Sequence, residues 1–398
     1  MGKSKKSILS SSLLMFGAGV SIAEILTGTM LSPLGLKNGI IAIILGHLIG
    51  AILLFLIGVI GSDTSKSSME SVKLSFGSKG GIFFSSLNIL QLVGWTGIMI
   101  ISGSMAANSI IPLSLSVWSL IIGILIIAWV MIGIKDISKI NIVAMSLLLI
   151  LTIILSKVIF SPNTVNTSII SKESLSFGLA VELSAAMPLS WLPLIADYTR
   201  EDKGNWSGAF FASVTYTFIS MWMYLIGLGA AIFTGKVDIA QIMMSSNLGL
   251  PALLIVVLST VTTTFLDVYS SGISSVSINT KLNEKTVAII VATIGILLAI
   301  FTPIASFEGF LYLIGSVFAP MAAIMISDYF ILHKDHSCQR FDVSNSILWI
   351  LGFIIYRISL NYETVLGNTL PVMIIIILIS LITNKITLRV KSLSTEQI

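Results

Sequence analysis

Long apolar stretches alternate with short polar segments along the whole chain. About 20 apolar residues are needed for a helix to cross the hydrocarbon core of a bilayer, so each long stretch is interpreted as a membrane-spanning helix. The predicted spans are residues 11–31, 39–60, 82–106, 117–134, 140–160, 177–196, 209–233, 250–278, 286–302, 309–331, 344–359 and 369–386. The pattern therefore predicts an all-α polytopic membrane protein with 12 transmembrane helices in a single integral membrane domain.

The composition supports this prediction and excludes a soluble fold. Hydrophobic residues make up 55% of the chain and charged residues 10%, and the mean hydropathy is +1.02. Globular proteins carry roughly 25% charged residues, because a surface that faces water must be polar. Residues 11–31 are interpreted as the first span and not as a cleaved signal peptide, since many further spans follow.

The basic residues are distributed unevenly between the predicted loops. With the first residues inside the cell, 17 of the 22 lysines and arginines lie on the cytoplasmic side, as the positive-inside rule requires. We therefore expect a multi-pass protein of the plasma or inner membrane with both termini cytoplasmic. Basic loops beside anionic lipid account for the net charge of +4, so the bilayer is the expected partner and no nucleic acid is. The five outer residues are Lys37, Lys157, Lys172, Lys236 and Arg357.

The first and the sixth span both contain residues that weaken or break a helix. Gly17 and Gly19 lie in the first span, and Pro188 and Pro193 lie in the sixth. Glycine lowers helix stability and proline removes a backbone donor. Transporters with inverted repeats use paired broken helices of this kind to present backbone groups to a substrate and a coupling ion. The alternative is that these residues only serve helix packing.

The matching positions of the two breaks predict an internal repeat. Five spans form the first repeat over residues 1–160, and five form the second over 177–331. Two additional helices follow over 344–386. A binding site is then expected near the middle of the bilayer, where the two repeats meet.

Several polar residues lie within predicted spans, where an ionisable group costs roughly 3 kcal/mol. Glu24, Glu182 and Asp267 are the acidic ones. Asp267 follows a stretch rich in hydroxyl groups that includes Ser259 and Thr260. Hydroxyl and carbonyl oxygens are ligands that alkali cations prefer, which predicts a cation site. The alternative is that the hydroxyls bond to their own helix or to a neighbouring helix.

One face of the third predicted span carries Asn88, Gln91 and Trp95, at positions i, i+3 and i+7. An aromatic wall with amide groups suits a planar heterocycle, and simple packing is the alternative for Trp95. His47 has no evident partner in the sequence and is interpreted as structural.

Other classes of protein find little support. Asp197 and Arg200 lie at the inner end of the sixth span and are interpreted as a loop or gate ion pair. No HExxH, GxSxG or P-loop pattern occurs, so no enzymatic activity is expected. No filter sequence of the TVGYG type occurs either. A channel or a membrane-embedded enzyme is the alternative to a transporter.

Several motifs resemble the nucleobase:cation symporter-1 family of purine, pyrimidine, allantoin and hydantoin permeases. The strongest are SWLPLIADYTR over residues 190–200, IGSVFAP over 314–320 and ISDYF over 326–330. Two further stretches, SIAEILTG over 21–28 and TTTFLDVYS over 262–270, are most similar to the branch assigned to hydroxymethylpyrimidine, a thiamine precursor.

The resemblance implies a LeuT-like fold of five plus five helices, with the substrate held between spans one, three, six and eight. By position, Trp95 resembles the tryptophan that stacks on the substrate ring, and Trp191 resembles the tryptophan of span six. The sodium site of sodium-coupled members uses carbonyls of span one and hydroxyls of span eight. In this chain these positions are Ala18, Ser21, Ser259 and Thr260.

The chain departs from the family pattern at two places. Met99 stands where hydantoin-type members have a glutamine, and Thr263, Thr264 and Asp267 stand where purine-type members have asparagines. A carboxyl group is a plausible replacement, because an aminopyrimidine presents an amino donor beside a ring nitrogen. Protonated Glu24 or Asp267 is predicted to pair with both atoms.

The sequence therefore predicts a secondary transporter that imports a pyrimidine by cation-coupled alternating access. Hydroxymethylpyrimidine is the expected substrate, and cytosine or another nucleobase is the alternative. Sodium and protons are both candidates for the coupling ion, and no other cofactor is expected. The predicted substrate-binding residues are Trp95, Gln91, Asn88, Glu24, Trp191, Thr263 and Asp267.

Overall fold

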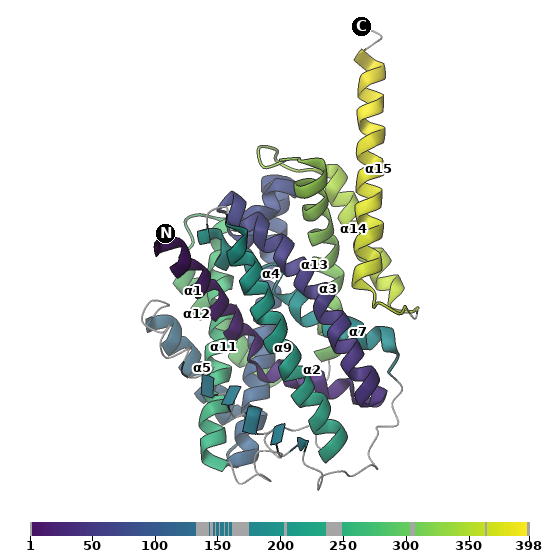
Figure 1. Cartoon of the computed structure of the whole chain (residues 1–398). Coiled ribbons are helices and arrows are strands. Elements are labelled where there is room, and N and C mark those ends of the chain that lie inside the picture. The colour runs from purple at the N-terminus through teal and green to yellow at the C-terminus, as the bar shows by residue number, and fades with distance from the viewer. Residues whose placement is uncertain are drawn as a thin grey trace.

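In the computed structural model, the chain forms a bundle of helices (Figure 1). The structure describes residues 2–132, 175–202, 205–235, 249–302, 307–362 and 364–395, together with parts of 143–160. Every regular element in these ranges is a helix. The predicted all-α architecture is thereby confirmed.

Most predicted spans correspond to one long helix each. These helices are α3 (Gly35–Thr64), α4 (Ser68–Ile110), α5 (Leu115–Ile132), α9 (Trp206–Thr234), α11 (Gly249–Ile278), α12 (Glu284–Phe301), α13 (Phe307–Ile326), α14 (Val343–Ser359) and α15 (Thr369–Thr395). Within the described part, seven helices are long and apolar enough to cross a membrane, and two bent pairs raise this to as many as nine. The predicted span 140–160 lies largely outside the described residues, so the total of 12 stays a prediction.

The first predicted span is broken, as its glycines indicate. Helix α1 (Gly2–Gly19) ends at the second glycine, and α2 (Ile22–Met30) begins three residues later at an angle of 47°. Ser21 has extended backbone angles and caps α2, because its hydroxyl accepts a hydrogen bond of 3.1 Å from the backbone N–H of Ala23. The break therefore frees backbone groups at the end of α1.

The sixth predicted span is broken as well, with a bend of 42°. Helix α7 (Phe177–Ser190) contains Pro188 in its last turn, and Pro193 lies in the turn that leads to α8 (Ile195–Thr199). The peptide N–H groups of Leu194 and Ile195 both donate to the carbonyl oxygen of Trp191, at 3.0 Å and 2.9 Å. The predicted break is confirmed, and the chain leaves the helix two residues after the first proline.

Helix α4 begins earlier than the predicted span 82–106. It starts at Ser68 and is kinked at Gly77, whose φ of 73° is unfavourable for residues with a side chain. The hydroxyl of Ser67 and the carboxylate of Glu70 form a capping box that starts the additional segment. The segment between the cap and Gly77 is polar enough to escape a search for apolar spans.

Two groups of helices pack around the breaks. Helix α9 contacts α1, α2 and α3, and α3 also contacts α7, while α4, α5, α11 and α12 contact one another. Glycines allow α2 and α9 to approach closely, because a Cβ at Gly227 would lie 2.0 Å from the carbonyl oxygen of Ile25. Figure 1 shows that α1 begins and α15 ends toward the same end of the bundle.

Candidate functional site

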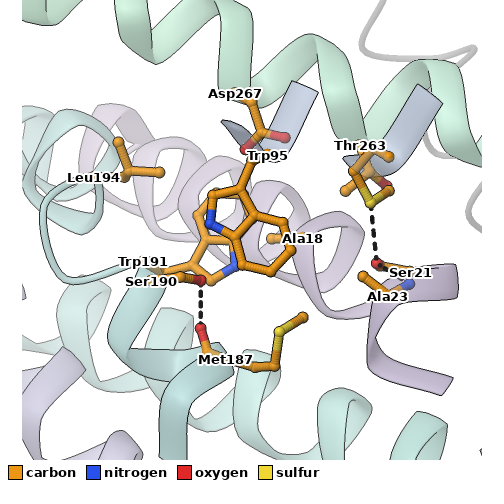
Figure 2. A pocket seen from close by; sticks show the side chains of 11 residues that line it. Ala18, Ser21, Ala23, Trp95, Met187, Ser190, Trp191, Leu194, Thr263 and Asp267 are labelled. Atoms are coloured by element: carbon orange, nitrogen blue, oxygen red, sulfur yellow. Dashed lines mark hydrogen bonds between the residues drawn. The ribbon is translucent and has the colours of Figure 1, made fainter. Parts of the chain in front are cut away.

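A small cavity of about 20 Å³ lies between the two helix breaks. Elements from four predicted spans, namely one, three, six and eight, form its wall (Figure 2). This is the arrangement expected for paired broken helices that expose backbone to a ligand. The lining residues are Ala18, Ser21, Ala23, Trp95, Met99, Met187, Ser190, Trp191, Leu194, Thr263 and Asp267.

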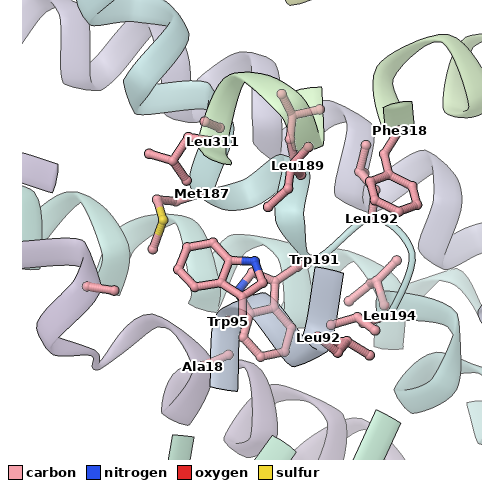
Figure 3. Close-up of a cluster of buried hydrophobic side chains, with 14 of the residues drawn as sticks. Ala18, Leu92, Trp95, Met187, Leu189, Trp191, Leu192, Leu194, Leu311 and Phe318 are labelled. Carbon is pink, nitrogen blue, oxygen red and sulfur yellow. The ribbon is translucent and has the colours of Figure 1, made fainter. Parts of the chain in front are cut away.

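Two indole rings form the aromatic part of this wall. Trp95 is 5% exposed, and the rings of Phe307 and Phe310 contact it edge-on at centroid distances of 5.9 Å and 5.4 Å. Trp191 lies beside Tyr216, with centroids 6.2 Å apart. Figure 3 shows both indoles within the buried apolar cluster of the bundle. Both predicted tryptophans thus line the same cavity.

The polar part of the wall comes from α11. Asp267 points from this helix toward the indole of Trp95 (Figure 2). Among the described residues no group hydrogen-bonds to its carboxyl group, although the residue is 5% exposed. The buried hydroxyl of Thr263 and the indole N–H of Trp95 also find no partner in the described part of the chain. Unpaired buried polar atoms on a cavity wall are available to a ligand.

The predicted amides of α4 do not line this cavity. Asn88 Nδ2 donates to Ser274 Oγ at 2.8 Å and to the carbonyl oxygen of Pro193 at 3.4 Å. Gln91 Nε2 donates to Asn88 Oδ1 at 2.8 Å and to the carbonyl oxygen of Ser190 at 3.3 Å. Both side chains therefore bond to the carbonyls that the sixth-span break leaves free.

Three of the predicted cation ligands, Ala18, Ser21 and Ser259, lie where α1 ends and α11 passes, whereas the side chain of Thr260 lies against Gly103 of α4. Ser259 Oγ donates to the carbonyl oxygen of Val20 at 3.4 Å, and Ala18 and Ser21 line the cavity nearby. The buried Thr260 Oγ1 has no hydrogen-bond partner among the described residues. Hydroxyl and carbonyl oxygens are a donor set that fits an alkali cation. The carbonyl of Val20 was not among the predicted ligands.

Glu24 lies outside the residues that line the cavity. Its carboxylate is fully buried and accepts hydrogen bonds from Tyr216 and Ser220 of α9. His47 of α3 contacts the same serine. The structure therefore does not bring Glu24 to Asp267, and it shows a partner for His47 that the sequence did not indicate.

Asp197 and Arg200 do not come within the ion-pair distance of 4.0 Å of each other in the described part of the chain. Asp197 Oδ1 instead accepts a hydrogen bond of 2.9 Å from the backbone N–H of Ser68. The hydroxyl of Ser68 accepts one of 2.9 Å from the N–H of Ala196. These two bonds join the start of α4 to α8, so Asp197 caps a helix instead of pairing with a cation.

Five lining residues were not among the predicted ligands, namely Met99 of α4 and four residues beside the helix breaks. Ala23, Met187, Ser190 and Leu194 flank the two breaks. Their side chains carry no chemical signal, but their places beside the predicted breaks could have indicated them. Position in the fold, and not residue type, selects them.

Comparison with known proteins places this architecture in a family. The family described as permease for cytosine/purines, uracil, thiamine and allantoin matches residues 3–393. The cytosine permease of Escherichia coli strain K12 is 23% identical over 350 residues, which cover 87% of this chain and 83% of that protein.

Solved structures share the fold. Mhp1, a nucleobase-cation-symport-1 family transporter, has a TM-score of 0.78 in a closed conformation with bromovinylhydantoin bound, at 20% identity over 94% of this chain and 90% of that one. A Na⁺-coupled sialic acid symporter has a TM-score of 0.69 at 14% identity, covering 93% of this chain and 87% of that one. The family match spans nearly the whole chain, and the LeuT-like fold that the resemblance implied agrees with the two broken helices. The protein therefore belongs to the nucleobase:cation symporter-1 family of permeases for cytosine/purines, uracil, thiamine and allantoin.

Proposed function

We propose that this protein imports a pyrimidine in symport with a cation, by alternating access. Hydroxymethylpyrimidine is the proposed substrate, and cytosine is the second candidate. The cavity between the two broken helices carries the proposal, because two indoles and one unpaired carboxyl group line it. A membrane transporter is favoured over a channel or an enzyme by the family to which the chain belongs.

The indoles suit a flat aromatic substrate. Trp95 and Trp191 present large apolar surfaces to the cavity, and offset or edge-on aromatic pairs add about 0.5–1.5 kcal/mol beyond the area that they bury. The unpaired indole N–H of Trp95 is a donor for a ring nitrogen or a hydroxyl of the substrate. A non-aromatic solute of the same size would gain less from these groups.

The carboxyl group of Asp267 suits an aminopyrimidine. When protonated it donates to a ring nitrogen and accepts from the adjacent amino group, so both atoms of the substrate are bonded at once. Cytosine also presents an amino group beside a ring nitrogen, and a cytosine permease is among the relatives. The hydroxymethyl group distinguishes the first candidate, and Thr263 Oγ1 is the free hydroxyl on the same helix that could bond to it.

The coupling cation is proposed to bind between α1 and α11. The carbonyl of Val20 and the hydroxyl of Ser259 are the proposed oxygen ligands there, and the unpaired hydroxyl of Thr260 is a third candidate. In the described part of the chain no group of three or more His, Cys, Asp and Glu side chains could hold a metal ion. Sodium is the proposed ion, since hard alkali cations favour such oxygens.

Uptake into proteoliposomes tests the function. Labelled hydroxymethylpyrimidine and labelled cytosine are supplied separately, with a sodium gradient or a pH gradient imposed alone. Saturable accumulation of one pyrimidine, driven by the sodium gradient, is expected. Accumulation of neither compound under either gradient would overturn the proposed substrate class, and uptake that does not saturate would indicate a channel.

The role of Asp267 is tested with Asp267→Leu. A leucine side chain has the same branching but neither donates nor accepts a hydrogen bond, so the dissociation constant of an aminopyrimidine should rise about 10- to 100-fold. A matched pyrimidine without the amino group serves as the control ligand, and its affinity should change much less. Equal effects on both ligands would show that Asp267 does not recognise the amino group.

A further inference from the structure

A chain of polar side chains lies behind the cavity wall, between α2, α3 and α9. The Oη of Tyr216 donates to Glu24 Oε1 at 2.6 Å, and Ser220 Oγ lies 2.7 Å from Glu24 Oε2. His47 Nε2 lies 2.7 Å from the same Ser220 Oγ. His47 Nδ1 lies 2.9 Å from the carbonyl oxygen of Ile43. Glu24, His47 and Ser220 are all fully buried.

The hydrogen atoms in this series of hydrogen bonds can be counted. A carbonyl oxygen only accepts, so His47 Nδ1 carries a hydrogen. Two contacts then remain, from His47 Nε2 to Ser220 Oγ and from Ser220 Oγ to Glu24 Oε2. Each contact needs one hydrogen, and the serine hydroxyl supplies one. The second hydrogen comes either from an imidazolium or from a carboxylic acid, so the intact chain holds one proton more than neutral histidine and glutamate carboxylate.

We propose that Glu24, Ser220 and His47 form a proton-binding site, separate from the substrate cavity, and that its single proton is required for substrate binding. The proton comes from the solution and returns to it. Its binding neutralises the charge of the carboxylate, and within the site it moves between Glu24 and His47 through the hydroxyl of Ser220.

Among the described residues, no fixed positive charge pairs with Glu24. Besides His47 of α3, the titratable groups that face it are Tyr216 and Tyr224 of α9. The Oη of Tyr224 donates to the carbonyl oxygen of Leu183 of α7 at 2.9 Å. In the described part of the chain neither a lysine nor an arginine forms an ion pair with Glu24. A buried carboxylate without a cation is unfavourable, so the proton is the group that completes the site.

The site is linked to the cavity through α2. Ala23 lines the cavity, and Glu24 is the next residue on the same short helix. Gly28 holds α2 against α9, because a Cβ there would lie 2.3 Å from the carbonyl oxygen of Tyr224. Without the proton, two acceptor atoms would face each other at 2.7 Å, either between Ser220 and Glu24 or between Ser220 and His47. Their repulsion would displace α2 and with it the cavity wall.

The substrate-binding half of this inference rests on the proposed function, and the experiment separates the two. Binding of hydroxymethylpyrimidine to the purified protein is measured by calorimetry between roughly pH 5 and pH 9. Affinity of the wild type should fall with rising pH, by about tenfold per pH unit above the midpoint, because one proton is lost. Glu24→Gln reproduces the protonated pattern, since its amide donates to Ser220 and accepts from Tyr216. Its affinity should change less than about twofold over the same range.

Thr217→Val is the matched control, because Thr217 lies on α9 between Tyr216 and Ser220 and bonds to the carbonyl of Ser213 in its own helix. It should keep the wild-type pH profile. Ser220→Ala removes the bridge and should shift the midpoint by about one pH unit or more. This variant decides the matter if Glu24→Gln does not fold. A wild-type profile in folded Glu24→Gln or in folded Ser220→Ala overturns the proton site, as does a pH dependence that only Asp267→Asn removes.

Thermal unfolding without substrate tests proton occupancy independently of transport. The wild type should lose stability relative to Glu24→Gln as the pH rises through the midpoint, because the folded site binds the proton. If no pyrimidine binds at any pH and this difference persists, the proposed substrate is wrong and the proton site stands. If wild type and Glu24→Gln have parallel pH profiles of unfolding, the proton site is wrong.

Discussion

Some buried hydroxyl groups of α11 bond within the helix, and others, including that of Ser277 near its end, have no partner in the described part of the chain. Thr260 Oγ1 and Thr263 Oγ1 are buried and have no partner among the described residues. Thr262 and Thr264 bond to carbonyls of their own helix, at 3.0 Å and 2.6 Å. A buried hydroxyl without a partner costs about 1–3 kcal/mol. The free hydroxyls of Thr260 and Thr263 are therefore the ones that we expect ligands to complete.

This contrast predicts different effects for two similar substitutions. Thr260→Val removes a free hydroxyl that is a candidate ligand of the proposed cation, so half-maximal uptake should require about tenfold more sodium. Thr264→Val removes a hydroxyl of the same type that already has a partner in its own helix, and the sodium requirement should stay within about twofold. The measurement is uptake into proteoliposomes as a function of sodium concentration. Equal sodium requirements in the two variants would contradict a role of Thr260 in cation binding.

The sequence indicated the acidic residues but not their partners. Asp267 was predicted for the substrate site and lines the cavity, whereas Glu24 was predicted for the same site and is bonded to α9. Tyr216 and Ser220 lie 192 and 196 residues away from Glu24 in sequence. The helical period gives the face of one helix, but it does not give the helix that packs against that face. Partners on distant spans could therefore not be read from the pattern.

At the level of helices, breaks were easier to predict than boundaries. Glycine and proline act on their own backbone, so the breaks near Ser21 and Pro193 followed from local chemistry. The helical segment that begins at Ser68 did not follow from hydropathy, because a capping box and not an apolar run starts it. The kink at Gly77 depends on tertiary contacts, since a Cβ there would lie 2.9 Å from the carbonyl oxygen of Gln339.

Helix α7 is joined to the C-terminal helices through one carboxylate. Glu182 accepts hydrogen bonds from the hydroxyl of Tyr356, from the hydroxyl of Thr369 at 2.6 Å, and from the backbone N–H groups of Asn368 and Thr369 at 2.6 Å and 2.8 Å. Gly367 makes room for this contact, since a Cβ there would lie 2.7 Å from Glu182 Oε2. Glu182, the third acidic residue that was predicted within a span, therefore has a structural environment away from the cavity.

Glu182→Gln should destabilise this junction. The amide oxygen can accept from both backbone N–H groups, but the NH₂ then takes the place of the acceptor of the Tyr356 and Thr369 hydroxyls, and this loss costs about 1–3 kcal/mol. Glu308→Gln is the control, because Glu308 accepts one bond, of 2.7 Å, from Tyr312 in its own helix. Thermal unfolding in detergent should show a clearly lower midpoint for Glu182→Gln than for Glu308→Gln. Equal midpoints would mean that the four bonds contribute little.

At the scale of the whole molecule, helix α8 bridges the two groups of helices on one side of the cavity. Helix α8 packs on α1 and α3, and its Tyr198 Oη forms a hydrogen bond of 2.9 Å with Ser270 Oγ of α11. The two bonds of Ser68 join the same helix to α4. If the groups rock against each other during transport, these contacts must break when the cavity opens on this side.

Weakening this junction should therefore favour the conformation that is open on the side of α8. Ser68→Ala leaves the N–H of Ala196 without its acceptor, which should shift the equilibrium by about fivefold. A cysteine introduced by Ser190→Cys, in a Cys338→Ser background, reports access to the cavity that Ser190 lines. Its modification by a membrane-impermeant thiol reagent from the side of α8 should be faster by the same factor. Ser71→Ala is the control, since Ser71 bonds to the carbonyl of Ser67 in its own segment; equal rates in both variants would mean that the Ser68 bonds do not hold the cavity closed.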